Sequence, residues 1–247
     1  ENRGFSFDPD ELIELINEKT SLIIINSPAN PTGGLINRNT LTKLVEKLQK
    51  YPNLSILSDE IYSQILYENE FYSMLNFKSI RDRLIILDGW SKTYAMTGWR
   101  IGYGIWPISL VDKATRLNVN SISCTNAATQ FAAIAALKGP QNDVSEMVRE
   151  FNVRRNLIVK NTNSIPGLSC AKPEGAFYVM PNITKTGLNS REMEHILLEE
   201  LKIATVAGTS FGSFGEGYIR LSYANSQENI LRALERINKY AEENNWG

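Results

Sequence analysis

The sequence is poor in the residues that build disulfide frameworks and metal sites. Its 247 residues include two cysteines and one histidine. Cys124 and Cys170 lie far apart and form no CxxC pair, so we expect free thiols in a reducing compartment. His195 lies in a helical stretch, where a partly exposed helix residue is expected more often than a catalytic base. The sequence therefore predicts no metal site.

An excess of charge of one sign and long apolar runs are also lacking. Lys and Arg number 26 against 27 acidic residues, so no basic field favours nucleic acid or an anionic membrane. The longest apolar runs, such as residues 22–25, are far too short to span a bilayer. No signal-peptide pattern opens the sequence. We expect a cytoplasmic globular protein that binds neither nucleic acid nor a membrane.

Short apolar strands alternate with amphipathic helices in the first part of the chain. Residues 21–26, 54–60 and 83–90 are the expected strands, and a helix with a leucine-rich stripe separates the first two. Repetition of strand, helix and strand is typical of a parallel sheet with right-handed crossovers. The sequence therefore predicts an α/β fold.

The link after the third strand breaks this alternation. A parallel return needs a crossover of a dozen or more residues, usually a helix, whereas this link is shorter and contains Gly98. We therefore expect residues 99–105 ("WRIGYGI") to return antiparallel after a helix-free connection. This return brings Arg100 to the edge of the sheet where the chain left Lys92.

The pattern changes again near residue 143. A long helical pattern from about Asp143 to Asn161 leads into a region where strands and helices mix without parallel spacing. We predict two domains, with residues 1–145 in the sheet domain and residues 146–247 in a smaller α+β domain entered by the long helix.

Polar side chains gather where the three expected parallel strands end. The carboxyl ends of such strands form the ligand-binding edge of an open α/β sheet. Taken singly, each residue has a common structural explanation: a turn, a helix N-cap or an exposed lysine. Together they place an amide, a carboxylate, a phenol, a hydroxyl, an amine and a guanidinium at one edge. The six residues are Asn30, Asp59, Tyr62, Ser91, Lys92 and Arg100.

A phosphorylated pyridine aldehyde uses such a set of groups well. A lysine amine forms a Schiff base with the aldehyde, and a carboxylate near the ring nitrogen keeps that nitrogen protonated. An amide and a phenol can hold the phenolate oxygen. A serine hydroxyl and a bidentate arginine suit the phosphate, which carries up to about two negative charges.

Four segments resemble the class I/II aminotransferases, which are fold-type I pyridoxal-phosphate enzymes. The resemblance covers essentially the whole chain and is most specific around the lysine. Two further stretches, residues 173–180 and 208–224, are similar to the subgroup of prokaryotic-type aspartate aminotransferases. The four segments are residues 26–34 ("NSPANPTGG"), 58–68 ("SDEIYSQILYE"), 89–103 ("GWSKTYAMTGWRIGY") and 217–224 ("GYIRLSYA").

The resemblance implies a fold and a set of site residues. The fold is a three-layer, mostly parallel sheet with one antiparallel strand, of which residues 1–145 form the C-terminal part of the cofactor-binding large domain, plus a small α+β C-terminal domain. Pyridoxal 5'-phosphate is the implied cofactor. By matching positions, Lys92 is the Schiff-base and proton-transfer residue, Asp59 pairs with the pyridinium nitrogen, Asn30 and Tyr62 hold the phenolate oxygen, and Ser91 and Arg100 bind phosphate.

The resemblance also implies substrate contacts. Arg220, together with Asn30, is the expected ligand of the substrate's α-carboxylate. From the residues alone, an arginine on the solvated face of a strand is the favoured interpretation of Arg220. The implied activity is ping-pong transfer of an amino group between an L-amino acid, such as aspartate or an aromatic one, and a 2-oxo acid such as 2-oxoglutarate. A homodimer is implied as well.

Two other functions stay open at the level of the sequence. One is a pyridoxal-phosphate carbon–sulfur β-lyase, which shares the fold and the cofactor contacts. The other is an aminotransferase-like sensing domain of a transcription regulator. Members of the family carry a long N-terminal portion before the position that matches Glu1, so we expect an N-terminally truncated chain with doubtful cofactor occupancy and weak activity of its own.

Overall fold

A computed structural model describes residues 1–247, which divide into two compact units. Whether these units correspond to a cofactor-binding domain over residues 1–145 and a small domain over residues 146–247 stays a prediction. Unit 1 comprises Glu1–Phe5, Ala29–Gly34 and Glu146–Gly247, and unit 2 comprises Ser6–Pro28 and Leu35–Ser145.

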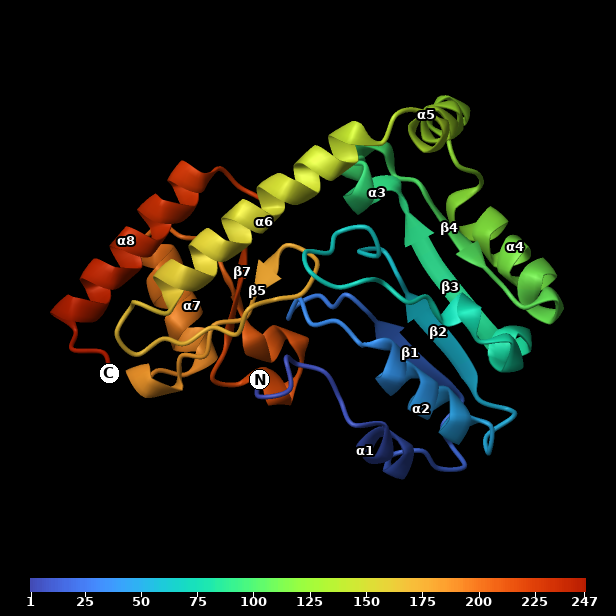
Figure 1. Cartoon of the computed structure of the whole chain (residues 1–247), viewed down its shortest axis with the longest axis horizontal. Helices are drawn as coiled ribbons and strands as arrows, with labels where there is room; N and C mark the ends of the chain where they lie inside the picture. The colour runs from blue at the N-terminus through green and yellow to red at the C-terminus, as the bar shows by residue number, and fades with distance from the viewer. The chain divides into compact units, whose positions relative to one another are not determined.

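Unit 2 contains a four-stranded sheet. Its strands lie in the order β1 (Leu22–Asn26), β2 (Ser55–Asp59), β3 (Leu84–Gly89) and β4 (Gly102–Ile105). The first three are parallel, and β4 pairs antiparallel with β3 (Figure 1). The predicted α/β fold with a mostly parallel sheet and one antiparallel strand is confirmed.

The core of unit 2 lies under one helix. Leu41, Leu44, Val45 and Leu48 repeat at helical spacing on α2 (Arg38–Leu48), and all four are at most 3% exposed. They form one cluster with strand residues such as Ile56. Burial of each leucine contributes about 1.5–3 kcal/mol relative to an exposed one. The remaining helices of unit 2 are α1 (Pro9–Glu14), α3 (Trp90–Thr93), α4 (Ile108–Ile122) and α5 (Ala127–Lys138).

The connection between β3 and β4 is not helix-free, so that prediction is wrong. It contains the single turn α3 and a 3-10 helix, Thr97–Trp99. The buried indole of Trp90 holds the turn in place, and its Nε1 donates to the carbonyl of Ala133 at 3.1 Å. A turn of four residues is too short to show a helical period in the sequence.

Unit 1 has an α+β arrangement, as predicted. Its antiparallel sheet has the order β5 (Tyr178–Val179), β7 (Ile219–Ser222) and β6 (Val206–Ala207). Its helices are α6 (Asn142–Thr162), which carries the chain out of unit 2, α7 (Ser190–Glu199) and α8 (Gln227–Glu243) (Figure 1).

The helices of unit 1 follow from local sequence signals. Asn189 and Glu192 form a capping box at the start of α7. On α8 the buried residues Ile230, Leu234 and Ile237 repeat at helical spacing and define one apolar stripe. Across the whole structure, no helix combines the length and the apolar character needed to cross a membrane.

Candidate active site

Neighbouring strand ends in unit 2 carry an acid and an amine. Asp59 is the last residue of β2, and Lys92 follows β3 by three residues on the turn α3. Asp59 is partly buried, and its Oδ1 accepts the backbone N–H of Ile61 at 3.2 Å. The positive charge of Lys92 acts on the carboxyl of Asp59. Parallel strands thus bring the two predicted residues together at one sheet edge.

Two glycines let the turn that carries Lys92 lie tightly against β4. Gly89 and Gly102 are register partners across β3 and β4. A Cβ added to Gly89 would lie 2.8 Å from the Cα of Gly102, closer than real Cβ contacts. The turn is fixed on its other side by Trp90 and Thr93, which are both buried. Lys92 therefore projects from a backbone that packing holds in place.

Burial is the main influence on the carboxyl of Asp59. It raises the pKa of Asp59 above the ordinary value, while the N–H of Ile61 and the charge of Lys92 act in the opposite direction. A half-buried carboxyl of this kind is best stabilised as an anion by a further cation. The site can therefore hold a protonated ring nitrogen next to Asp59.

Two more of the predicted residues lie near Lys92. Tyr62 is 3% exposed, and the Nζ of Lys92 lies 5.9 Å from the centroid of its ring. Ser91 precedes Lys92 on the same turn and is partly buried. Unit 2 thus brings together Asp59, Tyr62, Ser91 and Lys92.

Arg100 is placed differently. It has a left-handed backbone (φ 54°), is exposed, and its Nη1 donates to the carbonyl of Thr97 at 2.8 Å. It lines a cavity of about 750 Å³ whose lining includes neither Ser91 nor Lys92. A role of Arg100 in phosphate binding stays a prediction.

The remaining two predicted residues meet in unit 1. Nη1 of Arg220 on β7 donates to Oδ1 of Asn30 at 2.8 Å. The guanidinium carbon also lies 4.7 Å from the ring centroid of Tyr178 and 5.0 Å from that of Phe211. The buried Nε of Arg220 has no hydrogen-bond partner, and no ion pair includes this residue. A guanidinium held by rings and an amide, with no acidic partner, is suited to an incoming carboxylate.

Sequence reasoning missed the two rings around this guanidinium. Phe211 lies in the glycine-rich stretch of residues 208–217, which indicates only a flexible loop. Tyr178 lies on β5, beside the strand of Arg220. The signal that was available is the antiparallel pairing of the strands "FYVM" and "YIRLS", but short strands do not reveal their register.

A second acid, which lies near Asp59, was missed as well. Asp88 accepts the N–H of Gly89 at 2.7 Å and the hydroxyl of Tyr103, its register partner on β4, at 3.3 Å. Burial raises the pKa of Asp88, and the neighbouring charge of Asp59 adds to this effect. Burial and the charge of Asp88 raise the pKa of Tyr103 to about 12. The phenol thus stays protonated and continues to donate to Asp88.

Comparison with known proteins gives a consistent result. Residues 1–237 match the family described as aminotransferase class I and II. The chain is similar to aspartate aminotransferase of Pyrococcus horikoshii, with 39% identity over 98% of this chain and 62% of that protein. It is also similar to aromatic-amino-acid aminotransferase 2 of Thermococcus litoralis, with 38% identity over 98% of this chain and 63% of that protein.

Solved structures show the same likeness. The crystal structure of the aromatic aminotransferase from Pyrococcus horikoshii matches with a TM-score of 0.94 and 36% identity, covering 98% of this chain and 65% of that one. The chain thus spans a little over three fifths of the length of the relatives that it matches.

Proposed function

We propose amino-group transfer with pyridoxal phosphate for this chain, which belongs to the class I and II aminotransferase family. That family depends on pyridoxal phosphate. The observation that carries the proposal is the amine of Lys92 next to the half-buried carboxyl of Asp59, at the ends of neighbouring parallel strands. The relatives' names support it, since they are aspartate and aromatic-amino-acid aminotransferases.

The residues of unit 2 fit this cofactor. A lysine amine can condense with its aldehyde. Asp59, whose pKa burial raises, gains a cationic partner when the ring nitrogen is protonated. Tyr62 adds a phenol from the segment after β2. An amine, a carboxyl and a phenol on one edge are the donor set that an aldehyde, a pyridine nitrogen and a phenolate oxygen require.

Each residue has a distinct task in this proposal. When bound, the cofactor supplies an electron sink for the carbanion that forms at the substrate's α-carbon. Lys92 would take up the α-proton of the substrate and give it back in a 1,3-shift, acting as a general acid-base. Asp59 keeps the ring nitrogen protonated. The packing of Trp90 and Thr93 holds the lysine in a fixed position while it moves the proton.

Unit 1 supplies the proposed substrate contact. Arg220, which no ion pair includes, donates to the α-carboxylate of the amino acid, and Asn30 orients the guanidinium. We propose an L-amino acid as donor, with aspartate or an aromatic one favoured by the relatives' names, and a 2-oxo acid as acceptor. A carbon–sulfur β-lyase is not favoured, because the relatives named above are aminotransferases.

We further propose a homodimer located in the cytoplasm. The supporting observations are membership of the family and the small number of cysteines. Analytical ultracentrifugation of the protein encoded by the complete reading frame should give twice the mass of one chain. A monomer at micromolar concentration contradicts the dimer.

The activity is tested with the same full-length protein. Candidate amino acids are mixed with 2-oxoglutarate and added pyridoxal phosphate, and formation of each 2-oxo acid is followed. We expect the 2-oxo acid of the donor and glutamate in equal amounts. Release of pyruvate and ammonia without glutamate would instead identify a β-lyase, and absence of both products with every amino acid contradicts an enzymatic role.

A further inference from the structure

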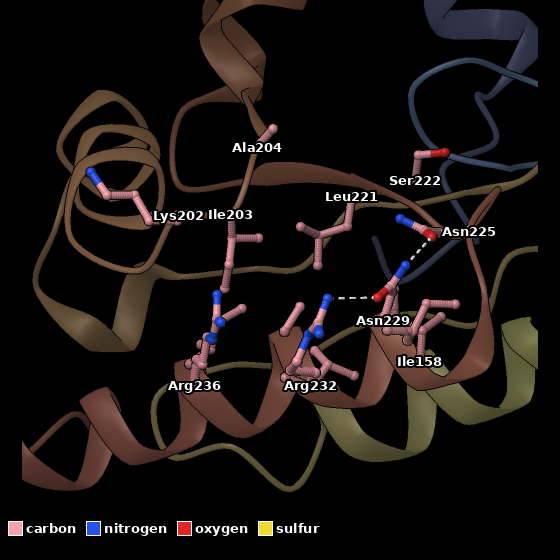
Figure 2. Close-up of a pocket in the computed structure, with 14 residues that line it drawn as sticks. Ile158, Lys202, Ile203, Ala204, Leu221, Ser222, Asn225, Asn229, Arg232 and Arg236 are labelled. Carbon is pink, nitrogen blue, oxygen red and sulfur yellow. Dashed lines mark hydrogen bonds between the residues drawn. The ribbon is translucent and has the colours of Figure 1, made fainter.

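A cavity in unit 1 contains none of the residues of the candidate active site. Its volume is about 310 Å³, near the lower end of the range for small-molecule pockets. Helix α8 forms one side, and β7, the segment after α7 and one residue of α6 complete it (Figure 2). We refer to it as the α8 cavity.

The floor of the α8 cavity is apolar. Leu221 of β7 and Ile158 of α6 are 8% and 3% exposed, and Leu234 of α8 is 4% exposed. Ile203, which is partly buried, projects toward α8 from the segment after α7 (Figure 2). The small exposed parts of the three buried side chains, together with the larger exposed part of Ile203, form the apolar surface that a short hydrocarbon body can contact.

The rim of the cavity is cationic. Arg232 and Arg236 lie four residues apart on α8, hence on the same face, and both rise toward Ile203 and Leu221 (Figure 2). Lys202 also lines the cavity, but its side chain projects away from the two arginines (Figure 2), and no acidic residue lines the cavity. Like charges at this spacing destabilise a helix slightly. An anion that binds between them removes that repulsion.

Neither arginine is neutralised within the structure. Nη2 of Arg232 donates to Oδ1 of Asn229 at 2.8 Å, and Nη1 of Arg236 donates to the carbonyl of Leu201 at 3.2 Å. Both acceptors are uncharged, and no ion pair includes either arginine. Each guanidinium has five N–H donors, so most of them stay available for a ligand.

The charges of α8 are segregated between two faces. Glu235 and Glu242 line a different cavity, together with Lys239. Lys202 approaches Glu199 at 3.8 Å, but these side chains are 71% and 55% exposed, so their interaction is weak. The rim of the α8 cavity therefore keeps a net positive charge above an apolar floor.

We propose that the α8 cavity binds a small amphipathic anion, with a carboxylate or phosphate head between Arg232 and Arg236 and a short hydrocarbon body over Leu221 and Ile203. Arginine is suited to this task because its planar fork pairs with either head in a bidentate manner. The proposal is independent of the proposed function, since Lys92, Asp59 and Arg220 do not line the cavity.

Calorimetric titration with hexanoate, acetate and inorganic phosphate at constant ionic strength tests the proposal. We expect saturable binding of hexanoate, with a gain over acetate of about fourfold in affinity for each methylene that becomes buried. The phosphate titration shows whether that head is also accepted. Absence of saturable hexanoate binding overturns the proposal, and binding of phosphate without hexanoate overturns the role of the apolar floor.

Matched charge removals locate the site. Arg232→Gln with Arg236→Gln should weaken hexanoate about tenfold or more, because the charge-assisted bonds are lost. Arg149→Gln with Lys239→Gln removes the same charge from residues that are 75% and 77% exposed elsewhere in unit 1, and should leave the affinity unchanged. Equal weakening by both double variants would mean unspecific attraction and would overturn the site.

The NMR resonances of methyl groups in the unaltered protein test the site even if a variant is unstable. In the unaltered protein, hexanoate should shift the methyl resonances of Ile203 and Leu221 but not that of Ile25, which is buried in unit 2. Shifts confined to other methyl groups would overturn the proposal. Retention of pyridoxal phosphate on Lys92 is measured separately, so the two proposals can fail independently.

Discussion

Lys92 of unit 2 and Arg220 of unit 1 lie in opposite electrostatic surroundings. In unit 2, Lys92 lies near Asp59, which in turn lies near Asp88, and burial raises the pKa of both acids. In unit 1, Arg220 is held by two aromatic rings and an amide, and no ion pair includes it. The amine that is proposed to react covalently thus has an acid nearby, whereas the guanidinium that is proposed to bind a carboxylate has none.

This difference has a physical reason. A resident carboxylate would compete with the substrate for Arg220, and displacing it would cost much of the binding free energy. Rings and an amide fix the direction of the guanidinium without neutralising it. In unit 2, by contrast, Asp59 is the proposed partner of the cofactor's ring nitrogen, and Asp88 accepts the backbone N–H of Gly89. The absence of a resident carboxylate at Arg220 is therefore as important for the proposed substrate binding as the presence of Asp59 is for the proposed cofactor binding.

Of the predicted changes, removal of the Lys92 amine should lower the activity most. Lys92→Ala should lower kcat for amino transfer roughly 10³-fold or more, since covalent attachment and general acid-base catalysis are both lost. Lys113→Ala on α4, an exposed position, serves as the control and should leave kcat unchanged. Normal turnover by the Lys92 variant would contradict the role of this residue.

Replacement of the Arg220 guanidinium should have the second largest effect on activity. Arg220→Lys keeps the charge but loses the planar fork, so kcat/KM for the amino acid should fall about 10²-fold while pyridoxal phosphate is still retained on Lys92. Arg191→Lys, at a residue 61% exposed on α7, is the matched control. If kcat/KM stays the same, Arg220 does not bind the substrate.

Loss of the Phe211 ring, which contacts Arg220, should affect activity less than loss of the guanidinium. Phe211→Leu removes the cation–π contact at 5.0 Å and should raise KM about threefold to tenfold, with kcat nearly unchanged. Phe214→Leu, at a fully exposed side chain in the same loop, provides the comparison. An equal rise of KM in both variants would assign the effect to the loop rather than to the ring.

Asp88, a partly buried acid of unit 2, should make the stability of the protein depend on pH. Burial raises the pKa of Asp88, so the charged carboxylate costs stability, and that cost disappears as the pH falls below the folded-state pKa. Asp88→Asn cannot ionise. Its melting temperature should therefore exceed that of the unaltered chain at pH 7.5, by about 1–3 °C, and the gap should close toward pH 4.

An exposed aspartate supplies the control for this prediction. Asp112→Asn on α4 should change the melting temperature by a similar small amount at every pH, because Asp112 is exposed to solvent. A gap for Asp88→Asn that widens as the pH falls would have the wrong sign and would refute the role of burial. The amide can still accept from Gly89 and donate to Tyr103, so the local hydrogen bonds are kept.

Much of the fold could be predicted because its signals are local. The apolar strands and the stripe on α2 are visible as periodicity, and the length of the link before residues 99–105 predicts the antiparallel return. The turn α3 could not be predicted, because it depends on the burial of Trp90 against a distant helix rather than on its own four residues.

The candidate site also contains residues that the sequence could place and residues that it could not. Asp59 and Lys92 could be placed together because one ends a parallel strand and the other closely follows the neighbouring strand. The rings around Arg220 come from segments about 40 and 9 residues away in the sequence, and only the folded chain joins them. The placement of Arg100, which lines a cavity without Lys92, also could not be predicted, because it depends on a left-handed backbone after a 3-10 turn.

Covalent trapping tests the central claim most directly. The protein is incubated with pyridoxal phosphate, reduced with borohydride and digested, and the modified lysine is identified by mass spectrometry. The account predicts a label concentrated on Lys92, which is lost in Lys92→Ala and reduced in Asp59→Asn. A label spread over exposed lysines, or one that persists equally in Lys92→Ala, would contradict it.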